Sequence, residues 1–420
     1  MHTASIVLFL LYASAAAMGH TDANSADCAG ICERESLTNG FFGLNEALEN
    51  KGLEISLSAT QVYQQDARGG LSTRNKSGRY EGSYDLELNA DMQKLLGIEG
   101  GSVYMLTEGS WSNGISDNSV GSIFGVNGDA AGDEAIVVTQ LWYQQWFGEE
   151  TFAIRLGKID LTGGFECHGC PVSFDGNRFA NDETSQFLNN ALINNPTIPF
   201  PDEGLGAILY WNPIDWWYAS FGIADAQADR RETGFDTAFH GEDFYISMFE
   251  TGITPQFESA NGPLQGAYRI GVWYDPQSKE RFESGNIKRD DTGFYVSLDQ
   301  TLIKENNAED DTQGLGAFAR YGYADKSVNE IARFISGGMQ YQGLFEDRDD
   351  DVIAVGIGYG KVSDDSDPSV DAETVYEVYY NIQITKWLYL TPDVQYIQNP
   401  AGAGNPGDAI VVGLRAQMSF

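Results

Sequence analysis

The chain ends with the stretch AIVVGLRAQMSF, residues 409–420, in which apolar side chains occupy every second position. One face would carry Ile410, Val412, Leu414, Ala416, Met418 and Phe420. The other face would carry Ala409, Val411, Gly413, Arg415, Gln417 and Ser419. Because successive side chains of a β-strand point to opposite faces, the stretch predicts a strand with one continuous apolar face.

Residues 78–94 show the same alternation over a longer distance. The apolar face has Tyr80, Gly82, Tyr84, Leu86, Leu88, Ala90 and Met92, and the residues between them are mostly charged or amide side chains. Strands in soluble sheets are usually about five or six residues long. A longer strand that is apolar on one face and polar on the other suits a tilted crossing of a lipid bilayer, with the polar face towards a water-filled lumen.

Similar alternation recurs along the whole chain and indicates sixteen strands. The candidate strands are residues 53–66, 78–94, 102–112, 136–147, 151–160, 204–212, 216–226, 243–254, 266–275, 292–303, 314–324, 333–342, 351–362, 373–384, 388–398 and 409–420. Tight turns at 148–150, 213–215 and 385–387 alternate with long connections such as 113–135 and 161–203. Short turns on one rim and long loops on the other are typical of an antiparallel up-and-down transmembrane β-barrel.

The tryptophans support this orientation, because they gather near the tight turns. They are Trp146, Trp211, Trp216, Trp217 and Trp387. Tryptophan is enriched where lipid meets water, since its ring is apolar and its N–H is a hydrogen-bond donor. We therefore expect these side chains to form an aromatic girdle at one rim.

Composition and the N-terminal region agree with an exported protein. The formal net charge of −36 argues against a nucleic-acid partner, because phosphates would be repelled. The apolar run near the start is shorter than the roughly 18–20 residues that a transmembrane helix needs, and small residues follow it. We expect a signal peptide over residues 1–19, a periplasmic segment with a short helix over 20–52, and the barrel over 53–420.

An outer-membrane barrel implies certain partners. These are membrane lipid, lipopolysaccharide and the barrel-assembly machinery, which we expect to recognise the terminal Phe420. The acidic runs at 309–311, 349–351 and 364–365 are interpreted as solvated turns, with binding of divalent cations between lipopolysaccharide head groups as the alternative.

The connection 161–203 is the longest, and loops beyond about 15 residues are usually functional. We expect it to fold inward and constrict the lumen, with a short helix over 182–194 capped by Asp182. Opposed charges and inward aromatic rings, including Trp142 and Tyr210, would then bind sugar hydroxyls and sugar C–H faces. The candidate channel residues are Glu81, Asp85, Arg155, Lys158, Asp160, Asp175, Arg178, Phe179, Arg269, Trp273, Arg320, Glu377 and Asp393.

Four stretches of the sequence carry a resemblance to a known family. Residues 374–385 (TVYEVYYNIQIT) and 390–400 (LTPDVQYIQNP), together with 43–52 (GLNEALENKG) and 155–160 (RLGKID), resemble the carbohydrate-selective porin (OprB) family. The resemblance implies a sixteen-stranded barrel that passes monosaccharides such as glucose by facilitated diffusion, and a homotrimer. The chain departs from the family pattern at Phe42 and Asn45, and in its strongly acidic composition.

The four cysteines are candidates for disulfides, because the periplasm is oxidising. Local pairing of Cys28 with Cys32 and of Cys167 with Cys170 is one interpretation, and a bridge between the two pairs is another. No cofactor or metal is expected, and no motif of a zinc protease, a Gly-x-Ser-x-Gly hydrolase or a phosphate loop occurs.

Two alternatives to a sugar-selective channel stay open. One is a general diffusion porin without sugar preference. The other is a secreted β-sandwich that binds glycans, which would be soluble without detergent.

Overall fold

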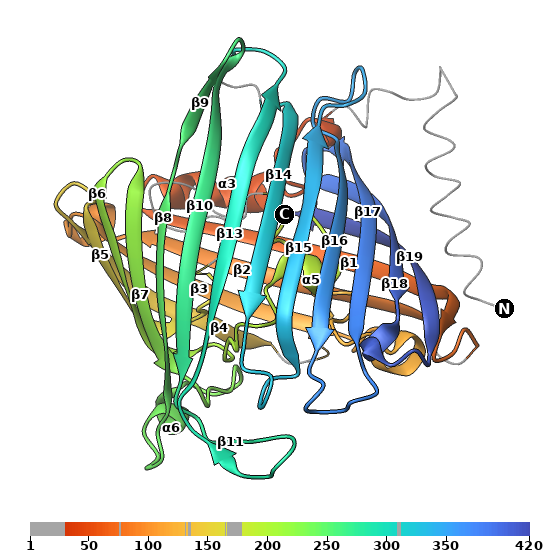
Figure 1. Ribbon diagram of the computed structural model, residues 1–420. Coiled ribbons are helices and arrows are strands. Elements are labelled where there is room, and N and C mark those ends of the chain that lie inside the picture. The colour runs from red at the N-terminus through yellow and green to blue at the C-terminus, as the bar shows by residue number, and fades with distance from the viewer. Residues whose placement is uncertain are drawn as a thin grey trace.

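The computed structural model describes residues 30–74, 77–130, 132, 136–163, 165, 179–308 and 312–420. Seventeen of their strands form one antiparallel sheet, and two more form a separate hairpin. Within the large sheet, β9 (Gln256–Ser259) pairs only with residues 262–265, so that 16 strands form the wall. The first strand pairs with both the second and the last, which closes the sheet into a barrel (Figure 1). The barrel strands are β1 (Leu53–Gly70), β2 (Gly78–Asp91), β3 (Gly101–Trp111), β4 (Val137–Phe147), β5 (Phe152–Ile159), β6 (Gly204–Ile214), β7 (Trp217–Asp225), β8 (Tyr245–Ile253), β10 (Gly262–Asp275), β13 (Asp291–Lys304), β14 (Gly314–Tyr323), β15 (Ile331–Gln342), β16 (Val352–Val362), β17 (Ala372–Thr385), β18 (Leu388–Gln398) and β19 (Gly407–Ser419).

Every strand that the alternation predicts is present, with small differences at the ends. The second strand is shorter than predicted, because Asp91 caps the short helix α4 (Met92–Leu96). Its side chain accepts hydrogen bonds from the N–H groups of Gln93 and Lys94. Carboxylates at a helix N-cap satisfy N–H groups that have no partner within the helix.

The N-terminal segment lies against the short-turn rim. The predicted helix corresponds to α3 (Asn39–Glu49), but Gly40 to Gly43 have positive φ, so its regular right-handed part starts after Gly43. The N–H of Leu37 donates to the carbonyl of Ser419 over 2.9 Å, next to the strand that closes the barrel. The predicted signal peptide lies outside the described residues. No helix in the described part of the chain is long and apolar enough to cross a membrane.

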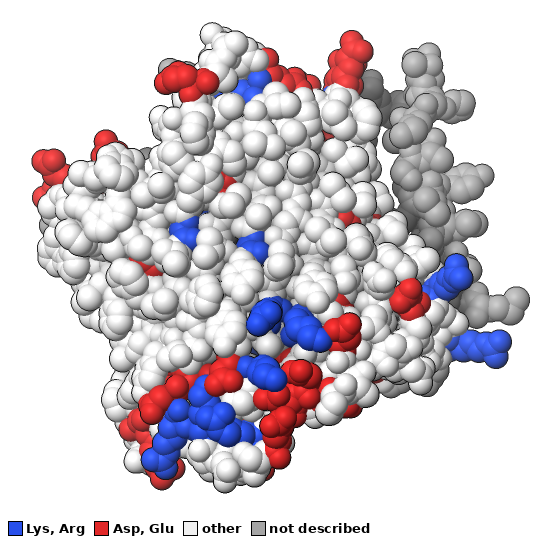
Figure 2. All heavy atoms as spheres, viewed as in Figure 1, with Lys and Arg blue, Asp and Glu red and all other residues white. Residues whose placement is uncertain are grey.

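The outer wall between the rims is apolar. Figure 2 shows Lys, Arg, Asp and Glu gathered at the two ends of the barrel, with a largely uncharged surface between them. On β19, Val412 is 39% exposed whereas Val411 and Arg415 are fully buried, as the sequence alternation predicts. Such a wall belongs in hydrocarbon.

The predicted tryptophan girdle is only partly correct. Trp211 and Trp216 are exposed on the outside near the tight turn between β6 and β7, and Trp217 packs edge-on against Trp211. Trp146, however, packs against the buried cluster inside the barrel. Its cross-strand partner Ala153 is fully buried, so the alternation of β4 turns this ring inward.

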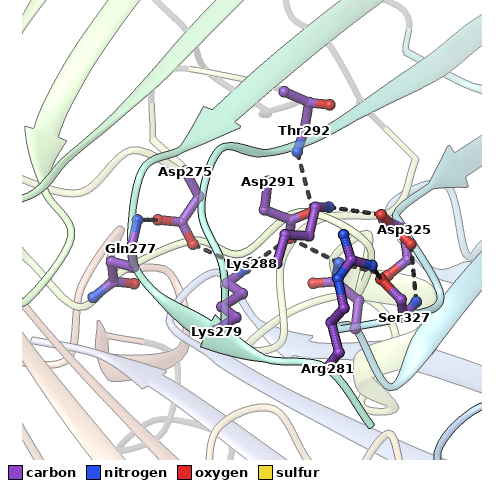
Figure 3. A network of polar contacts seen from close by, with 10 residues as sticks. Asp275, Gln277, Lys279, Arg281, Lys288, Asp291, Thr292, Asp325 and Ser327 are labelled. Atoms are coloured by element: carbon purple, nitrogen blue, oxygen red, sulfur yellow. Dashed lines mark hydrogen bonds and ion pairs between the residues drawn. The ribbon is translucent and has the colours of Figure 1, made fainter. Parts of the chain in front are cut away.

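The long-loop rim is held by a network of ion pairs (Figure 3). The hairpin of β11 (Lys279–Glu280) and β12 (Ile287–Lys288) supplies two lysines. Lys279 binds Asp275 and Asp291 at 2.9 and 2.8 Å, and Lys288 binds Asp291 and Asp325 at 2.7 Å each. The network therefore fastens the β10–β13 loop to the β14–β15 loop.

Two long loops fold into the barrel instead of standing above it. Residues 115–130 lie against β1, β2 and β17, and residues 179–198 lie against β14 to β19. Their apolar side chains form buried clusters with the inner face of the wall, including Phe124 with Phe334 and Phe187 with Tyr379. In the described residues of the second loop, the only helix is α5 (Asn190–Ile193), which Asn189 caps, so the longer helix predicted over 182–194 is wrong. Asp182 instead accepts hydrogen bonds within a turn, from Thr184 and Ser185.

Candidate functional site

The inward carboxylate of Glu377 on β17 holds the second loop. Its two oxygens accept hydrogen bonds from the backbone N–H groups of Leu188 and Asn189, at 2.6 and 2.9 Å. On the neighbouring side, Arg320 of β14 donates to the carbonyl of Leu192 at 2.8 Å and to that of Ala180. Both side chains are almost completely buried.

The first inward loop is held in the same way. Glu81 of β2 accepts a hydrogen bond from the amide of Asn127 at 2.7 Å. The amides of Gln64 and Gln395, from β1 and β18, both donate to the carbonyl of Val126 at 2.8 Å. Polar side chains of the inner wall therefore replace water as partners of loop backbone groups, which cannot be buried without hydrogen bonds.

Five of the predicted channel residues consequently support the inward loops or the buried clusters. Glu81, Arg320 and Glu377 bind loop backbone or loop side chains. Asp393 accepts a hydrogen bond from Gln395 at 3.2 Å, behind the same loops. Phe179 is 8% exposed and belongs to a hydrophobic cluster with Phe318. None of these five lines the polar cavity between the wall and the inward loops.

A second group of predicted residues lies in the wall on the other side of the barrel. Arg155 stacks on the ring of Trp142, with its guanidinium carbon 3.9 Å from the ring centroid. Tyr104 stacks on the same ring at 5.0 Å, so neighbouring strands cover Trp142 on both flanks. Arg269 pairs with Asp299 at 3.4 Å, and both side chains are buried. Trp273 is also buried inside the barrel.

The prediction that Lys158 faces the lumen is wrong. Its cross-strand partner on β4 is Leu141, which is half exposed on the outer wall. Three residues after the inward Arg155, strand alternation turns the Lys158 side chain outward. Its ammonium donates to three backbone carbonyls, at 2.6, 2.7 and 2.9 Å.

Some predicted residues fall outside the described part of the chain. These are Asp175, Arg178, Cys28, Cys167 and Cys170. Cys32 is described and exposed. The disulfide pairing and the role of Arg178 stay predictions.

A polar cavity of about 440 Å³ remains between the wall and the inward loops. Strands β2 to β4 supply Ser83, Glu108 and Gln140. The two inward loops and the β7–β8 loop complete the lining, with Asp129, Asp160, Thr162, Asn181, Glu183, Asn194, Asp202, Glu203 and Arg230. Asp85 lies beside it, directly opposite Glu108 in the pairing of β2 with β3.

The cavity is rich in carboxylates and has a single described cation, Arg230. The guanidinium of Arg230 lies 3.3 Å from Glu108 and 3.8 Å from Glu203, so it binds the wall and the second loop together. Asp160 accepts hydrogen bonds from Thr162, which holds it at the root of the loop. Among the described residues, no three His, Cys, Asp or Glu side chains form a group that could hold a metal ion.

Burial makes two loop carboxyls of this cavity weaker acids. Burial, followed by the negative charge of Asp182, raises the pKa of Glu183 to about 7. Burial also raises the pKa of Glu203 to about 7, although Arg230 acts in the opposite direction. Both groups therefore change charge near neutral pH.

Of the predicted channel residues, Asp160 lines the cavity and Asp85 lies next to it. Glu108 could have been found from the sequence, because it lies on the polar face of a predicted strand. Asp129, Glu183, Asp202, Glu203 and Arg230 come from loops. Alternation does not apply to loops, so only the tertiary fold reveals where these side chains point.

Comparison with known proteins gives a consistent result. Residues 75–420 match the sequence model of a family described as carbohydrate-selective porin, OprB family. The chain is 24% identical to Porin B of Pseudomonas aeruginosa over 417 residues, which covers 90% of each protein. It is 20% identical to the putative porin QuiX of Acinetobacter baylyi, covering 92% of this chain and 94% of that one. The high-pH structure of Pseudomonas putida OprB superposes with a TM-score of 0.79 at 21% identity, over 93% of this chain and 99% of the other.

Proposed function

Because this chain belongs to the carbohydrate-selective porin family OprB, we propose that the acidic cavity is the constriction through which monosaccharides such as glucose cross. The protein is an outer-membrane diffusion channel and not an enzyme, as its relatives are porins. The inward loop 161–203 would set the width of the passage.

The observation that carries this proposal is the chemistry of the cavity lining. Carboxylates accept hydrogen bonds from sugar hydroxyls, and the amides of Gln140, Asn181 and Asn194 can both donate and accept. A diffusing sugar must exchange water for these partners and then leave, so weak binding at several groups is the useful arrangement.

The test is the single-channel current in planar bilayers as glucose is added. We expect glucose to block the ion current in a saturable way, and Asn194→Ala to weaken that block, because Asn194 is an exposed amide of the lining. Asn286→Ala is the matched control, since this amide lies in the β10–β13 loop, away from the cavity lining. A current that does not respond to glucose would contradict sugar binding.

A general diffusion porin is the second candidate, and one feature favours it. The described lining of the cavity contains no Phe, Tyr or Trp on which a sugar ring could stack. In that case sucrose, glucose and salts would be distinguished by size alone, and no sugar would block the current.

Three further partners are part of the proposal. We infer that the terminal Phe420 is recognised by the barrel-assembly machinery, that lipopolysaccharide surrounds the long-loop rim, and that the protein assembles as a homotrimer. Electrophoresis of unboiled protein in detergent tests the last point, since a trimer would migrate at about three times the monomer mass of 46.0 kDa.

A further inference from the structure

The cavity has more negative than positive charge, and part of that charge has no partner. Of its described carboxylates, Glu108 and Glu203 share Arg230, whereas Asp129, Glu183 and Asp202 form no ion pair with any described residue. Asp85 adds to the negative charge from the adjoining wall. In a narrow passage between low-dielectric walls, such charges attract cations strongly.

Asp129 supplies a second, independent observation. It comes from the first inward loop, lines the cavity and is 8% exposed. Ser83 of the wall is a hydrogen-bond partner of its carboxyl group, and burial raises the pKa of Asp129, whereas Oδ2 has no hydrogen-bond partner among the residues that the structure describes. A buried carboxylate oxygen without a donor is costly, so its presence in a cavity points to a ligand that brings the donor.

The two observations specify the ligand chemistry. A sugar hydroxyl can donate a hydrogen bond, but it does not balance the surplus charge. An ammonium group does both, and hydrogen bonds from an ammonium to a carboxylate are among the stronger ones in proteins. We propose that the constriction prefers sugars that carry a protonated amine, such as glucosamine, over neutral and anionic sugars. This preference rests on the proposed function, because it assumes that sugars pass through this cavity.

The experiment compares sugars that differ in charge at neutral pH in planar bilayers. Glucosamine carries an ammonium at the position where N-acetylglucosamine has a neutral amide, and glucuronate carries a carboxylate. We expect glucosamine to block the ion current at about three- to tenfold lower concentration than glucose or N-acetylglucosamine, which is the gain from one charge-assisted contact. Glucuronate should block least.

Variants connect the preference to the cavity. Asp129→Asn removes the charge and keeps the shape, so the advantage of glucosamine over glucose should fall towards unity. Glu183→Gln should also reduce the advantage of glucosamine over glucose, and it serves as a second variant if Asp129→Asn does not fold. Asp215→Asn is the matched control, because this exposed carboxylate lies in the tight turn between β6 and β7. Folding of each variant is checked by electrophoresis in detergent, because a folded barrel migrates differently from the same protein after boiling.

The outcomes separate this inference from the proposed function. If glucose and glucosamine block equally, the ammonium preference is wrong while the sugar channel stands. If both cavity variants keep the full preference, its assignment to Asp129 and Glu183 is wrong. If no sugar blocks the current of the unmodified protein, the proposed function itself is wrong.

Discussion

Glu377 lies on the inner face of β17 with both carboxylate oxygens bound to backbone N–H groups of the second inward loop. This side chain stabilises the loop by accepting both hydrogen bonds, since the two buried N–H groups would otherwise lack an acceptor. The same holds for the other wall residues that bind loop backbone, so individual side chains decide whether the loops stay inside the barrel.

Replacing Glu377 by Ala should release the loop. Two buried N–H groups would lose their acceptor, at a cost of about 1–3 kcal/mol each. We expect a lower midpoint of thermal unfolding in detergent and a larger, noisier single-channel current. Glu258→Ala should change neither quantity, because Glu258 is exposed on the four-residue strand β9. An unaltered current in the Glu377 variant would show that the loop is held by other contacts.

At the scale of elements, β16 has small residues on its inner face, so the second inward loop can pack closely against it. Its inward positions are Ala354, Gly356, Gly358 and Gly360, and its outward positions are bulkier. A Cβ at Gly356 would lie 2.9 Å from side-chain atoms of Leu192 and of Phe187. Because the three inward glycines of this strand have no side chain, α5 and its flanking residues can approach the wall closely.

Gly356→Leu should therefore displace the second loop. We expect the sugar block of the current to weaken and the conductance to change, because the loop borders the cavity. Val355→Leu is the control on the same strand, since Val355 is 52% exposed on the lipid face. Equal behaviour of the two variants would argue against a role of this packing in the passage.

The β11–β12 hairpin gives a second prediction for an element. Lys288→Ala would leave Asp291 and Asp325 without a shared cation, so the hairpin should loosen and chymotrypsin should cleave faster after Phe282. Lys326→Ala should leave cleavage unchanged, because its ion pairs with Asp364 and Asp365 lie outside this network and Lys326 is largely exposed. If the two variants are cleaved at the same rate, the network does not hold the hairpin.

For the whole molecule, the arrangement of charge matters more than any single contact. On the face that Figure 2 shows, the wall is largely uncharged between the rims, and the acids of the inward loops face the remaining cavity. The net charge of −36 thus has a local counterpart in the carboxyl groups that line this cavity.

This arrangement predicts that ion selectivity depends on pH. Glu183, near Asp182 and Glu108, and Glu203, near Arg230 and Asp160, each have a pKa of about 7. Above that pH both are ionised and the preference for K⁺ over Cl⁻ should be largest; as pH falls through 7 they become neutral and the preference should decline. The measurement is the reversal potential in a KCl gradient between pH 8 and 5. In Glu183→Gln the change should be smaller, and a pH-independent potential would contradict the assignment.

The sequence by itself determined the barrel, because period-two alternation in strands such as 409–420 follows directly from backbone geometry and fixes which face meets lipid. It also determined that a long connection follows the fifth strand. Only the tertiary structure decided what the inward charges do. Arg320 and Glu377 satisfy buried loop backbone, and Glu81 binds the side-chain amide of Asn127. Asp129 and Glu183, which no periodicity marks, line the cavity. The physical reason is that a loop side chain takes its direction from the contacts that hold its backbone, and these contacts come from strands distant in sequence.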